Sequence, residues 1–508
     1  MKPYRELSKE ELLALQAELQ AEYDAEKEKS LNLDISRGKP GKEQLDLSMP
    51  MMDVLNAESV LASENGTDVR NYGVLDGIPE AKELMAGMVG AKPSQMIVLG
   101  NSSLNIMYDC VARAEIFGIM GNTPWSKLDK VKFLCPVPGY DRHFGVTEQF
   151  GIEMINVPMT EDGPDMDVVE DYVNNDPAVK GIWCVPMFSN PGGVVYSDET
   201  VKRFANLKPA AKDFRIFWDN AYGIHYLYDR PESEQPHILN ILEECEKAGN
   251  PDIVYEFCST SKITFPGAGV AAMASSEANI ADIKSKLKWQ TIGPDKINQL
   301  RHVRYFKDIN GMKDYMKKHA AILRPKFEMI LDTFERELKG LGAGSWYSPK
   351  GGYFITYETL DGCAKNVVAK AKKADMKTLV DIMDNVFPMI STSLSKSDIV
   401  SLGMNMLSYQ LGDTCGFPFE HRTSDLSGDS EVPVTLSWNV TRLHDYLFGI
   451  KDYEPSAGVQ ERSAHIEEVS GFSKGSAVSK ENYTLNGEEA GKDVDDNIPG
   501  IQETESET

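Results

Sequence analysis

Between about residues 95 and 275, short apolar runs alternate with segments long enough to form helices. The runs cover residues 96–99, 132–135, 182–185, 215–218, 253–258 and 269–274. Each run has the length of a buried strand, and a helix-length segment between successive strands is typical of parallel pairing with helices on both faces of the sheet. The pattern therefore predicts an α/β fold with a mostly parallel sheet, in which ligands bind at the carboxyl ends of the strands.

Composition excludes several classes of protein. The chain has 508 residues, 41% of them hydrophobic, which predicts a large core and two or more domains. A formal net charge of −25 argues against binding to nucleic acid or to an anionic membrane surface, because both require basic patches. No apolar run approaches the ~20 residues of a membrane span, and residues 1–30 resemble neither a signal peptide nor a transit peptide.

Cysteine and histidine usage points to a cytoplasmic protein without a metal site. The seven cysteines are scattered among apolar neighbours and form no C-x-x-C pair, which favours reduced, buried thiols. The eight histidines show no metal-ligand spacing, and we interpret them as structural or surface groups. We therefore expect no bound metal and a cytoplasmic location.

A lysine and an aspartate follow two of the apolar runs. Lys262 lies just beyond the run 253–258, between hydroxyl side chains, and Asp219 directly follows the run 215–218. Pyridoxal phosphate (PLP) chemistry requires an amine that forms a Schiff base with the cofactor aldehyde, and a buried carboxylate that keeps the pyridine nitrogen protonated. Lys262 is therefore the candidate Schiff-base lysine and general base, and Asp219 the candidate partner of the ring nitrogen. Ser259 and Ser261 are candidate donors to the phosphate.

Further motifs lie on both sides of this pair. They include Ser36-Arg37-Gly38-Lys39-Pro40, Asn71-Tyr72-Gly73, Gly100-Asn101-Ser102-Ser103-Leu104, Pro138-Gly139-Tyr140, Ser189-Asn190-Pro191-Gly192-Gly193, Gly293-Pro294-Asp295-Lys296 and Pro349-Lys350-Gly351-Gly352-Tyr353-Phe354. With them, roughly residues 30–407 resemble the class I/II (fold-type I) PLP-dependent aminotransferases, and are most similar to the bacterial type Ic aspartate aminotransferase subgroup. The resemblance implies a large domain around a mostly parallel sheet and a smaller α+β domain.

The resemblance assigns three more residues to the cofactor ring. Tyr222 and Asn190 match positions that hydrogen-bond the phenolic oxygen of the cofactor, and Tyr222 is a candidate catalytic residue with Lys262 and Asp219. Tyr140 matches the aromatic residue that stacks on the ring face. These matches imply that the ring is held from its edge and from one face.

The resemblance also implies a phosphate site that involves two subunits. Ser102 and Ser103 match phosphate ligands, together with the backbone N–H groups that open an expected helix at about 103–117, where the helix dipole favours an anion. Tyr72 matches a residue that reaches the phosphate of a neighbouring subunit. The active unit is therefore expected to be a homodimer with shared active sites.

The chain departs from the family pattern at two places. Many class I enzymes have a phosphate-binding arginine where this chain has Val270, a feature that the subgroup shares. The family also binds the substrate α-carboxylate through an arginine on a strand near the C-terminus, because a guanidinium pairs with a carboxylate through two hydrogen bonds. After Leu407 no segment has that pattern, and Arg422 and Arg442 only flank the stretch 432–439.

The leading functional hypothesis is an aminotransferase that exchanges amino groups by a ping-pong mechanism. The resemblance alone implies aspartate as the donor and a 2-oxo acid, such as 2-oxoglutarate, as the acceptor. Candidate substrate-binding residues are Arg37, Gly38, Asn190 and Arg301. Two alternatives stay open: a PLP-dependent lyase or decarboxylase, since the residues around Lys262 would serve those reactions too, and a catalytically impaired PLP-binding protein, since the carboxylate arginine is not found.

The predicted domains follow the element pattern. They are an N-terminal helix and arm at 1–48 that belongs to the small domain, a large PLP-binding domain at 49–310, a small C-terminal domain at 311–407, and a divergent acidic tail at 408–508 that we expect to be largely disordered. Ser8 and Glu11 have the spacing of a capping box at the start of a helix over 8–29. A long helix is expected over 310–341, and a strand over 353–357.

Overall fold

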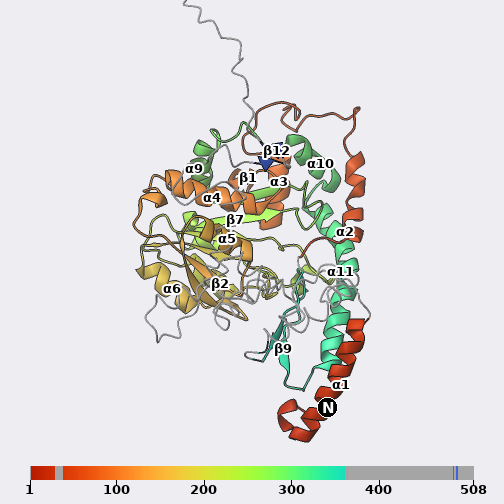
Figure 1. Ribbon diagram of the computed structural model, residues 1–508. Coiled ribbons are helices and arrows are strands. Elements are labelled where there is room, and N and C mark those ends of the chain that lie inside the picture. Colours follow the sequence, from red (N-terminus) through yellow and green to blue (C-terminus); the bar gives the residue numbers. More distant parts are fainter. Residues whose placement is uncertain (1, 29–37, 361–362, 364–483, 486–487, 490–508) are drawn as a thin grey trace, which may run out of the picture.

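A computed structural model describes residues 2–28, 38–360, 363, 484–485 and 488–489 of the chain. Within these residues an eight-stranded sheet has the strand order β1-β8-β7-β6-β5-β2-β3-β4 (Figure 1). Its strands are β1 (Met96–Val98), β2 (Lys132–Val137), β3 (Glu153–Thr160), β4 (Gly163–Pro164), β5 (Val179–Cys184), β6 (Arg215–Asp219), β7 (Val254–Ser259) and β8 (Ala271–Ala274). Strands β3, β2, β5, β6 and β7 are parallel, whereas β8 is antiparallel to both β7 and β1. The predicted α/β fold with a mostly parallel sheet is confirmed.

Each predicted apolar run contains at least half of a strand. The bounds differ by a few residues, as where the run 182–185 forms the end of β5. Strands β3 and β4 were not among the predicted runs. Because β3 pairs with β2 and with the two-residue β4, it lies near one edge of the sheet, and its residues are only partly buried. Such a strand lacks the continuous apolar pattern on which the prediction was based.

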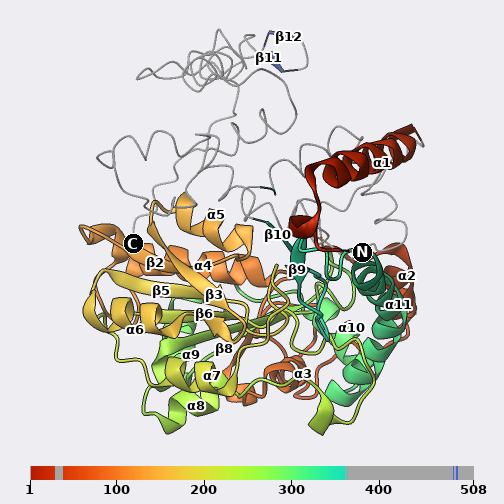
Figure 2. The same ribbon diagram turned by 90° about the horizontal axis from the view of Figure 1, so that it is seen from below.

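Two hydrophobic cores cover the two faces of the sheet. Along β6, Ile216 and Trp218 belong to one core and Phe217 to the other, as expected where successive side chains point to opposite faces. The first core includes residues of α3 (Pro79–Val89), α6 (Met166–Asn175), α7 (Asp198–Ala205), α8 (Ile241–Lys247), α10 (Lys296–Phe306) and α11 (Ile309–Glu337). The second includes residues of α4 (Ser103–Phe117), α5 (Asp141–Gln149) and α9 (Glu277–Leu287). Figure 2 shows α4 and α5 on one side of the sheet and α7 and α8 on the other.

The long helix α11 runs beside a third core. Leu323, Phe327 and Phe334 of this helix belong to the same core as Phe354 and Tyr357. Near its end, β9 (Gly344–Trp346) pairs antiparallel with β10 (Tyr357–Thr359). The strand predicted over 353–357 thus begins only at Tyr357. The division into a large and a small domain stays a prediction, since residues 364–407 lie outside the described residues.

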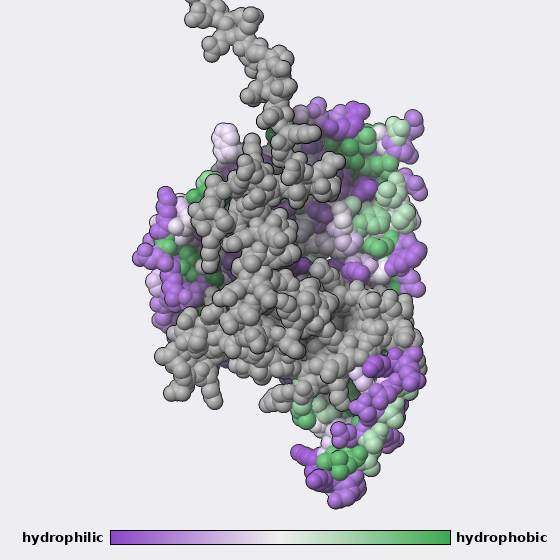
Figure 3. Space-filling view, viewed as in Figure 1, coloured by the Kyte–Doolittle hydropathy of each residue, from purple (hydrophilic) through white to green (hydrophobic). Residues whose placement is uncertain are grey.

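The N-terminal helix begins with the predicted capping box. The backbone N–H of Ser8 donates to Glu11 Oε2 at 2.7 Å, and the N–H of Glu11 donates to Ser8 Oγ at 3.2 Å. The helix that follows, α1 (Lys9–Glu28), has exposed leucines, among them Leu13, and Figure 3 shows hydrophobic residues among polar ones at this lower end of the molecule. A short helix, α2 (Lys42–Leu47), follows in the arm. Of the acidic tail, only β11 (Thr484–Leu485) and β12 (Glu488–Glu489) are described.

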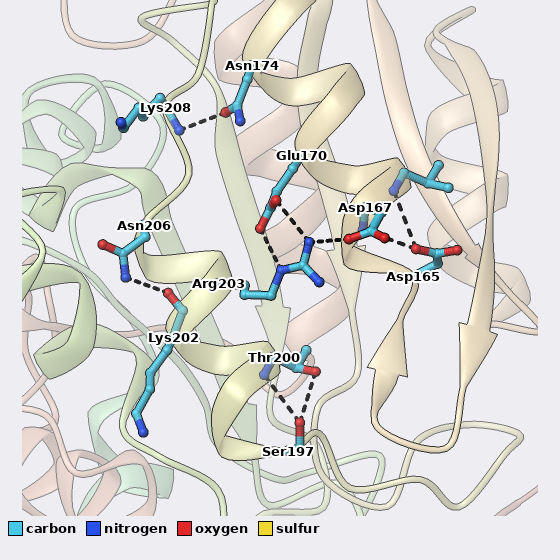
Figure 4. Close-up of polar contacts among 11 residues, drawn as sticks. Asp165, Asp167, Glu170, Asn174, Ser197, Thr200, Lys202, Arg203, Asn206 and Lys208 are labelled. Atoms are coloured by element: carbon cyan, nitrogen blue, oxygen red, sulfur yellow. Dashed lines mark hydrogen bonds and ion pairs between the residues drawn. The ribbon is translucent and has the colours of Figure 1, made fainter.

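Helices α6 and α7 are joined by charged side chains (Figure 4). Arg203 of α7 donates to both carboxylate oxygens of Glu170 on α6, at 2.7 and 2.9 Å. At the start of α6, the Asp165 carboxylate accepts from the backbone N–H groups of Asp167 and Val168, at 3.0 and 3.4 Å. Asp165 therefore satisfies two of the N–H groups that a helix leaves free at its beginning.

We expect Asp165→Ala to lower the free energy of unfolding by about 1 kcal/mol, the usual cost of losing a helix cap. Denaturant unfolding of the purified protein measures this. Asp171→Ala is the matched control, because Asp171 is an exposed aspartate in the middle of the same helix, where a change of no more than about 0.5 kcal/mol is expected. Equal losses in the two variants would contradict the capping role.

Candidate active site

The candidate site residues lie at the carboxyl ends of neighbouring strands. Asp219 is the last residue of β6, and Lys262 follows the end of β7. Asn190 lies beyond β5 and Tyr140 beyond β2. Because β7, β6, β5 and β2 are consecutive in the sheet, these four segments leave it side by side at the same edge. This is the edge at which ligands bind in parallel sheets of this kind.

Asp219 is buried, and only one of its two carboxylate oxygens has a hydrogen-bond partner among the described residues. Its side chain is 4% exposed, and its Oδ2 pairs with Nε2 of His143 on α5 at 3.1 Å. His143 in turn stacks on Trp183, with 4.6 Å between ring centroids. Asp219 Oδ1 has no hydrogen-bond partner among the described residues. Since a buried carboxylate oxygen requires a donor, Oδ1 fits a protonated ring nitrogen.

The environment of Lys262 makes its amine reactive. Burial lowers the pKa of Lys262 to about 8, although the Asp219 carboxylate acts in the opposite direction. About a tenth of the amine is therefore unprotonated at pH 7, far more than for an ordinary lysine, and the unprotonated amine is the form that a nucleophile or general base requires. The Nζ atom donates to the carbonyl of Gly38, which brings one predicted substrate-binding residue next to the lysine.

The backbone carbonyl of Lys262 is held by residues from distant parts of the chain. It accepts from the Tyr353 hydroxyl at 2.9 Å and lies 3.4 Å from Nε2 of His225. The Tyr353 oxygen accepts from Gln44 Nε2 at 3.1 Å, and the same amide lies 3.0 Å from His319 Nδ1 on α11. The network joins the N-terminal arm, α11 and the segment that carries Lys262.

We expect Tyr353→Phe to lower the free energy of unfolding by about 1–3 kcal/mol, because the buried Lys262 carbonyl loses a donor and Gln44 loses an acceptor. Urea unfolding measures the change. Tyr108→Phe removes a hydroxyl from a tyrosine that is 40% exposed, and should change stability by no more than about 0.5 kcal/mol. A Tyr353→Phe protein as stable as the wild type would show that the network contributes nothing.

The segments that carry the predicted phosphate-binding serines lie close together near the start of α4. Ser102 is the residue before the first turn of α4, and Ser103 begins the helix, whose first N–H groups lack intrahelical partners. At the end of β7, Ser259 Oγ donates to Ser261 Oγ at 3.0 Å, and Ser261 Oγ donates to the carbonyl of Asn101 at 3.1 Å. The structure thus brings the predicted phosphate ligands together at a helix N-terminus, where an anion is favoured.

The remaining ring-binding candidates lie around the same edge. Tyr222 is 4% exposed, and burial raises its pKa well above the ordinary value, so that its hydroxyl stays protonated. Tyr140 and Asn190 line one pocket together with His143 and Ser189. Tyr140, Asn190 and His143, the hydrogen-bond partner of Asp219, therefore line a common space.

Three predicted residues are not joined to this group by a described contact. The Arg301 guanidinium contacts the side chains of Asn298 and Met52. Tyr72 is 80% exposed. Arg37 lies outside the described residues, and so does the region after Leu407 in which the carboxylate arginine was sought.

Sequence reasoning missed the histidine that holds Asp219. The sequence pattern predicts that all eight histidines are structural or surface groups, and His143 is buried in α5. Its position one helical turn after Tyr140, behind a strand that ends at the ligand edge, was the available signal. Gln44 and Tyr353 gave no comparable signal, because their partners are far away in the sequence.

The described residues contain neither a membrane-spanning helix nor a cluster of metal ligands. No helix in the described part of the chain is long and apolar enough to cross a membrane. Within the same residues, no group of three or more His, Cys, Asp or Glu side chains could hold a metal ion. Cys110, Cys135, Cys184, Cys245 and Cys258 are buried free thiols.

A buried aspartate and a lysine of lowered pKa, at the ligand edge of this sheet, are features of the fold-type I PLP-dependent enzymes, which include aminotransferases. The family model described as aspartate amino-transferase matches residues 7–387, and the chain belongs to that family. The chain is 46% identical over 365 residues to an aspartate aminotransferase of Corynebacterium glutamicum, covering 70% of this chain and 82% of the relative. It is 44% identical over 373 residues to a putative aminotransferase of Mycolicibacterium smegmatis, covering 73% and 86%.

Solved structures agree with this assignment. An aspartate transaminase from C. glutamicum is 44% identical with a TM-score of 0.70, covering 73% of this chain and 87% of that one. A putative aminotransferase from Corynebacterium diphtheriae is 43% identical with a TM-score of 0.68, covering 77% and 96%. The predicted family and aminotransferase function are confirmed, and the comparisons do not favour the lyase or the impaired protein.

Proposed function

We propose that the protein uses PLP to transaminate aspartate with a 2-oxo acid such as 2-oxoglutarate. The observation that carries the proposal is the buried Asp219, whose free Oδ1 requires a donor, next to a lysine whose pKa is lowered to about 8. The name of the C. glutamicum relative supports aspartate as the donor.

Each residue has a distinct role in this proposal. When bound, PLP supplies an electron sink that lets the Cα–H bond of the amino acid break. Lys262 holds the cofactor through its amine and, once released, carries a proton from the substrate Cα to the cofactor. Asp219, fixed by His143, keeps the ring nitrogen protonated. Tyr222 donates to the phenolic oxygen, since its raised pKa keeps it protonated.

Further residues orient the cofactor and the substrate. Asn190 is the second proposed donor to the phenolic oxygen, and Tyr140 stacks on the ring. The hydroxyl groups of Ser102, Ser103, Ser259 and Ser261 hold the phosphate with the first N–H groups of α4. Gly38, Arg37 and Arg301 are the proposed substrate contacts. Of these, Gly38 has a described contact with Lys262, which supports its position at the site.

The proposed active unit is a homodimer. Tyr72 is 80% exposed. Two apolar residues of a neighbouring segment are also exposed, Trp289 at 84% and Ile292 at 61%. The two segments approach closely, because a Cβ on Gly293 would lie 2.6 Å from the carbonyl oxygen of Gly73. A second copy of the chain would cover these side chains and bring Tyr72 to the phosphate of the neighbouring site.

The proposed location is the cytoplasm. Five buried free thiols support it, because reduced cysteines are usual where glutathione and thioredoxin keep thiols reduced. The thiols of Cys135 and Cys110 are also protected chemically, since burial raises the pKa of both and little reactive thiolate forms.

A single-turnover experiment tests the proposed reaction. The PLP-loaded protein is mixed with L-aspartate alone, and we expect the visible absorbance of the lysine-bound cofactor to fall while one equivalent of oxaloacetate forms. Adding 2-oxoglutarate should restore the absorbance and yield glutamate. Release of carbon dioxide or of free ammonia instead would show a decarboxylase or a lyase.

A further inference from the structure

A buried amide–carboxyl pair lies beside the proposed cofactor site. Asn220, the residue after Asp219, donates from Nδ2 to Oε1 of Glu256 on β7 at 3.1 Å. Its backbone N–H donates to the carbonyl of Phe257, also on β7, at 2.8 Å. The turn that leaves β6 is therefore fastened to β7 both by its backbone and by this side-chain pair.

One oxygen of each side chain in this pair has no hydrogen-bond partner among the described residues. Asn220 is 7% exposed and Glu256 is 3% exposed. Asn220 Oδ1 and Glu256 Oε2 are both buried, and neither has a hydrogen-bond partner among the described residues. Both atoms are acceptors when Glu256 is ionised, so two buried lone-pair groups stay unsatisfied. One proton on Glu256 would turn Oε2 into a donor, so that the pair would hold one free donor and one free acceptor in place of two free acceptors.

The surroundings of Glu256 also disfavour a negative charge. Burial raises the pKa of Glu256 to about 8, and the hydrogen bond from Asn220 opposes this only in part. The titratable neighbours that sense Glu256 are the thiols of Cys245 on α8 and Cys258 on β7, and burial raises the pKa of each. Neither thiol can supply a positive charge. Asp219, which also influences Cys258, adds a second carboxylate to this region.

The pair supports the turn that presents two proposed cofactor ligands. The turn runs over residues 219–223, from Asp219 through Tyr222 to Gly223. A Cβ on Gly223 would lie 2.6 Å from Asn220 Oδ1, so the Asn220 amide packs directly on this glycine. The Asn220 side chain is thus in contact with Glu256 on one side and with the end of the turn on the other.

We propose that Glu256 works as a neutral carboxylic acid, hydrogen-bonded to Asn220, and is the positioning residue for the turn that carries Asp219 and Tyr222. The inference rests on the proposed roles of those two residues at the cofactor. Glu256 itself touches neither cofactor nor substrate in this arrangement. It acts through Asn220, because the hydrogen bond from Nδ2 to Glu256 Oε1 holds the amide between β7 and Gly223 at the end of the turn.

Substitutions at position 256 separate this role from a general need for a side chain. Glutamine is uncharged, accepts through one atom and donates through the other, and therefore reproduces the acid form. We expect PLP dissociation constants and kcat values of Glu256→Gln within about twofold of the wild type. Glu256→Ala leaves the Asn220 amide unpaired, and should weaken PLP binding about tenfold or more. Glu256→Gln as impaired as Glu256→Ala would overturn the proposal.

A direct measurement of the proton does not depend on the cofactor or on activity. The full-length protein is labelled with glutamate that carries ¹³C in the side-chain carboxyl group, and infrared spectra are recorded at pH 7. We expect the wild type minus Glu256→Gln difference spectrum to contain the C=O band of a protonated carboxylic acid. Glu83→Gln, which replaces an exposed glutamate on α3, is the control and should remove only carboxylate absorbance. A difference spectrum for Glu256 that contains only carboxylate bands would overturn the proposal.

The two experiments also separate this inference from the proposed function. A protein that fails to bind PLP but shows the acid band would contradict the cofactor assignment and leave the state of Glu256 established. A protein that transaminates normally but lacks the acid band would support the proposed function and contradict the neutral state of Glu256. Each result therefore identifies which of the two proposals is wrong.

Discussion

Lys262→Ala is expected to abolish both the visible absorbance of the lysine-bound cofactor and transamination. Lys262 is the lysine that follows β7 at the ligand edge, and its pKa of about 8 makes its amine available for covalent attachment. Without it the cofactor can be held only by noncovalent contacts, and no group remains to carry the proton from the substrate Cα. Absorbance spectra and the aspartate half-reaction measure the two losses.

Borohydride reduction provides the matching chemical test. Reduction of the wild type should fix the cofactor on the peptide that contains Lys262, as peptide mapping will show. Lys212→Ala, which removes an exposed lysine just before β6, should leave both the label and the activity unchanged. A label on any other lysine would rule out the assignment.

Asp219→Ala is expected to retain part of the affinity for PLP but to lose nearly all transamination. The phosphate ligands proposed near α4 do not depend on Asp219, so some binding should persist. Without the carboxylate the ring nitrogen loses its proton and electrons can no longer be withdrawn from the substrate. A loss of several decades in kcat is expected, at about 1.4 kcal/mol of barrier per decade.

The choice of variants makes this prediction specific. Asp219→Asn keeps the size of the side chain and removes its charge, so it should be almost as inactive as the alanine variant. His143→Ala leaves the carboxylate but removes the group paired with its Oδ2 at 3.1 Å, and a smaller loss is expected. Near-normal turnover by Asp219→Asn would exclude the role given to the charge.

Much of the sheet was predictable because its strands are buried on both faces. In the run 215–218, the three residues after Arg215 are all apolar, since they contribute to the cores on both sides. The position of β8 was not predictable in this way. It is inserted between β7 and β1 and is antiparallel to both, although its own sequence resembles that of any other buried strand. Local patterns do not encode a strand's neighbours.

In the candidate site, too, some residues could be predicted from the local sequence and others could not. Lys262 and Asp219 could be found because each lies at or shortly after the end of an apolar run and has a side chain suited to the chemistry. The partners that hold them could not: His143 lies 76 positions from Asp219, and Tyr353 lies 91 positions from Lys262. Histidine, glutamine and tyrosine are common buried polar residues, and only the tertiary structure shows which of them meet.

The pairing of β1 with β8 has a consequence for the order of events on the ribosome. β1 is at the edge of the sheet, and its one neighbour there is β8, which is made more than 170 residues later. Until Ala271–Ala274 emerges, the segment that leads into Ser102 has no strand on which to form. The interior strands β2, β5 and β6 can pair earlier, because their partners are nearer in the sequence. In a nascent chain, Asp219 would therefore reach its final position before the proposed phosphate-binding residues around Ser102 do. The chain would be able to retain a cofactor only late in its synthesis.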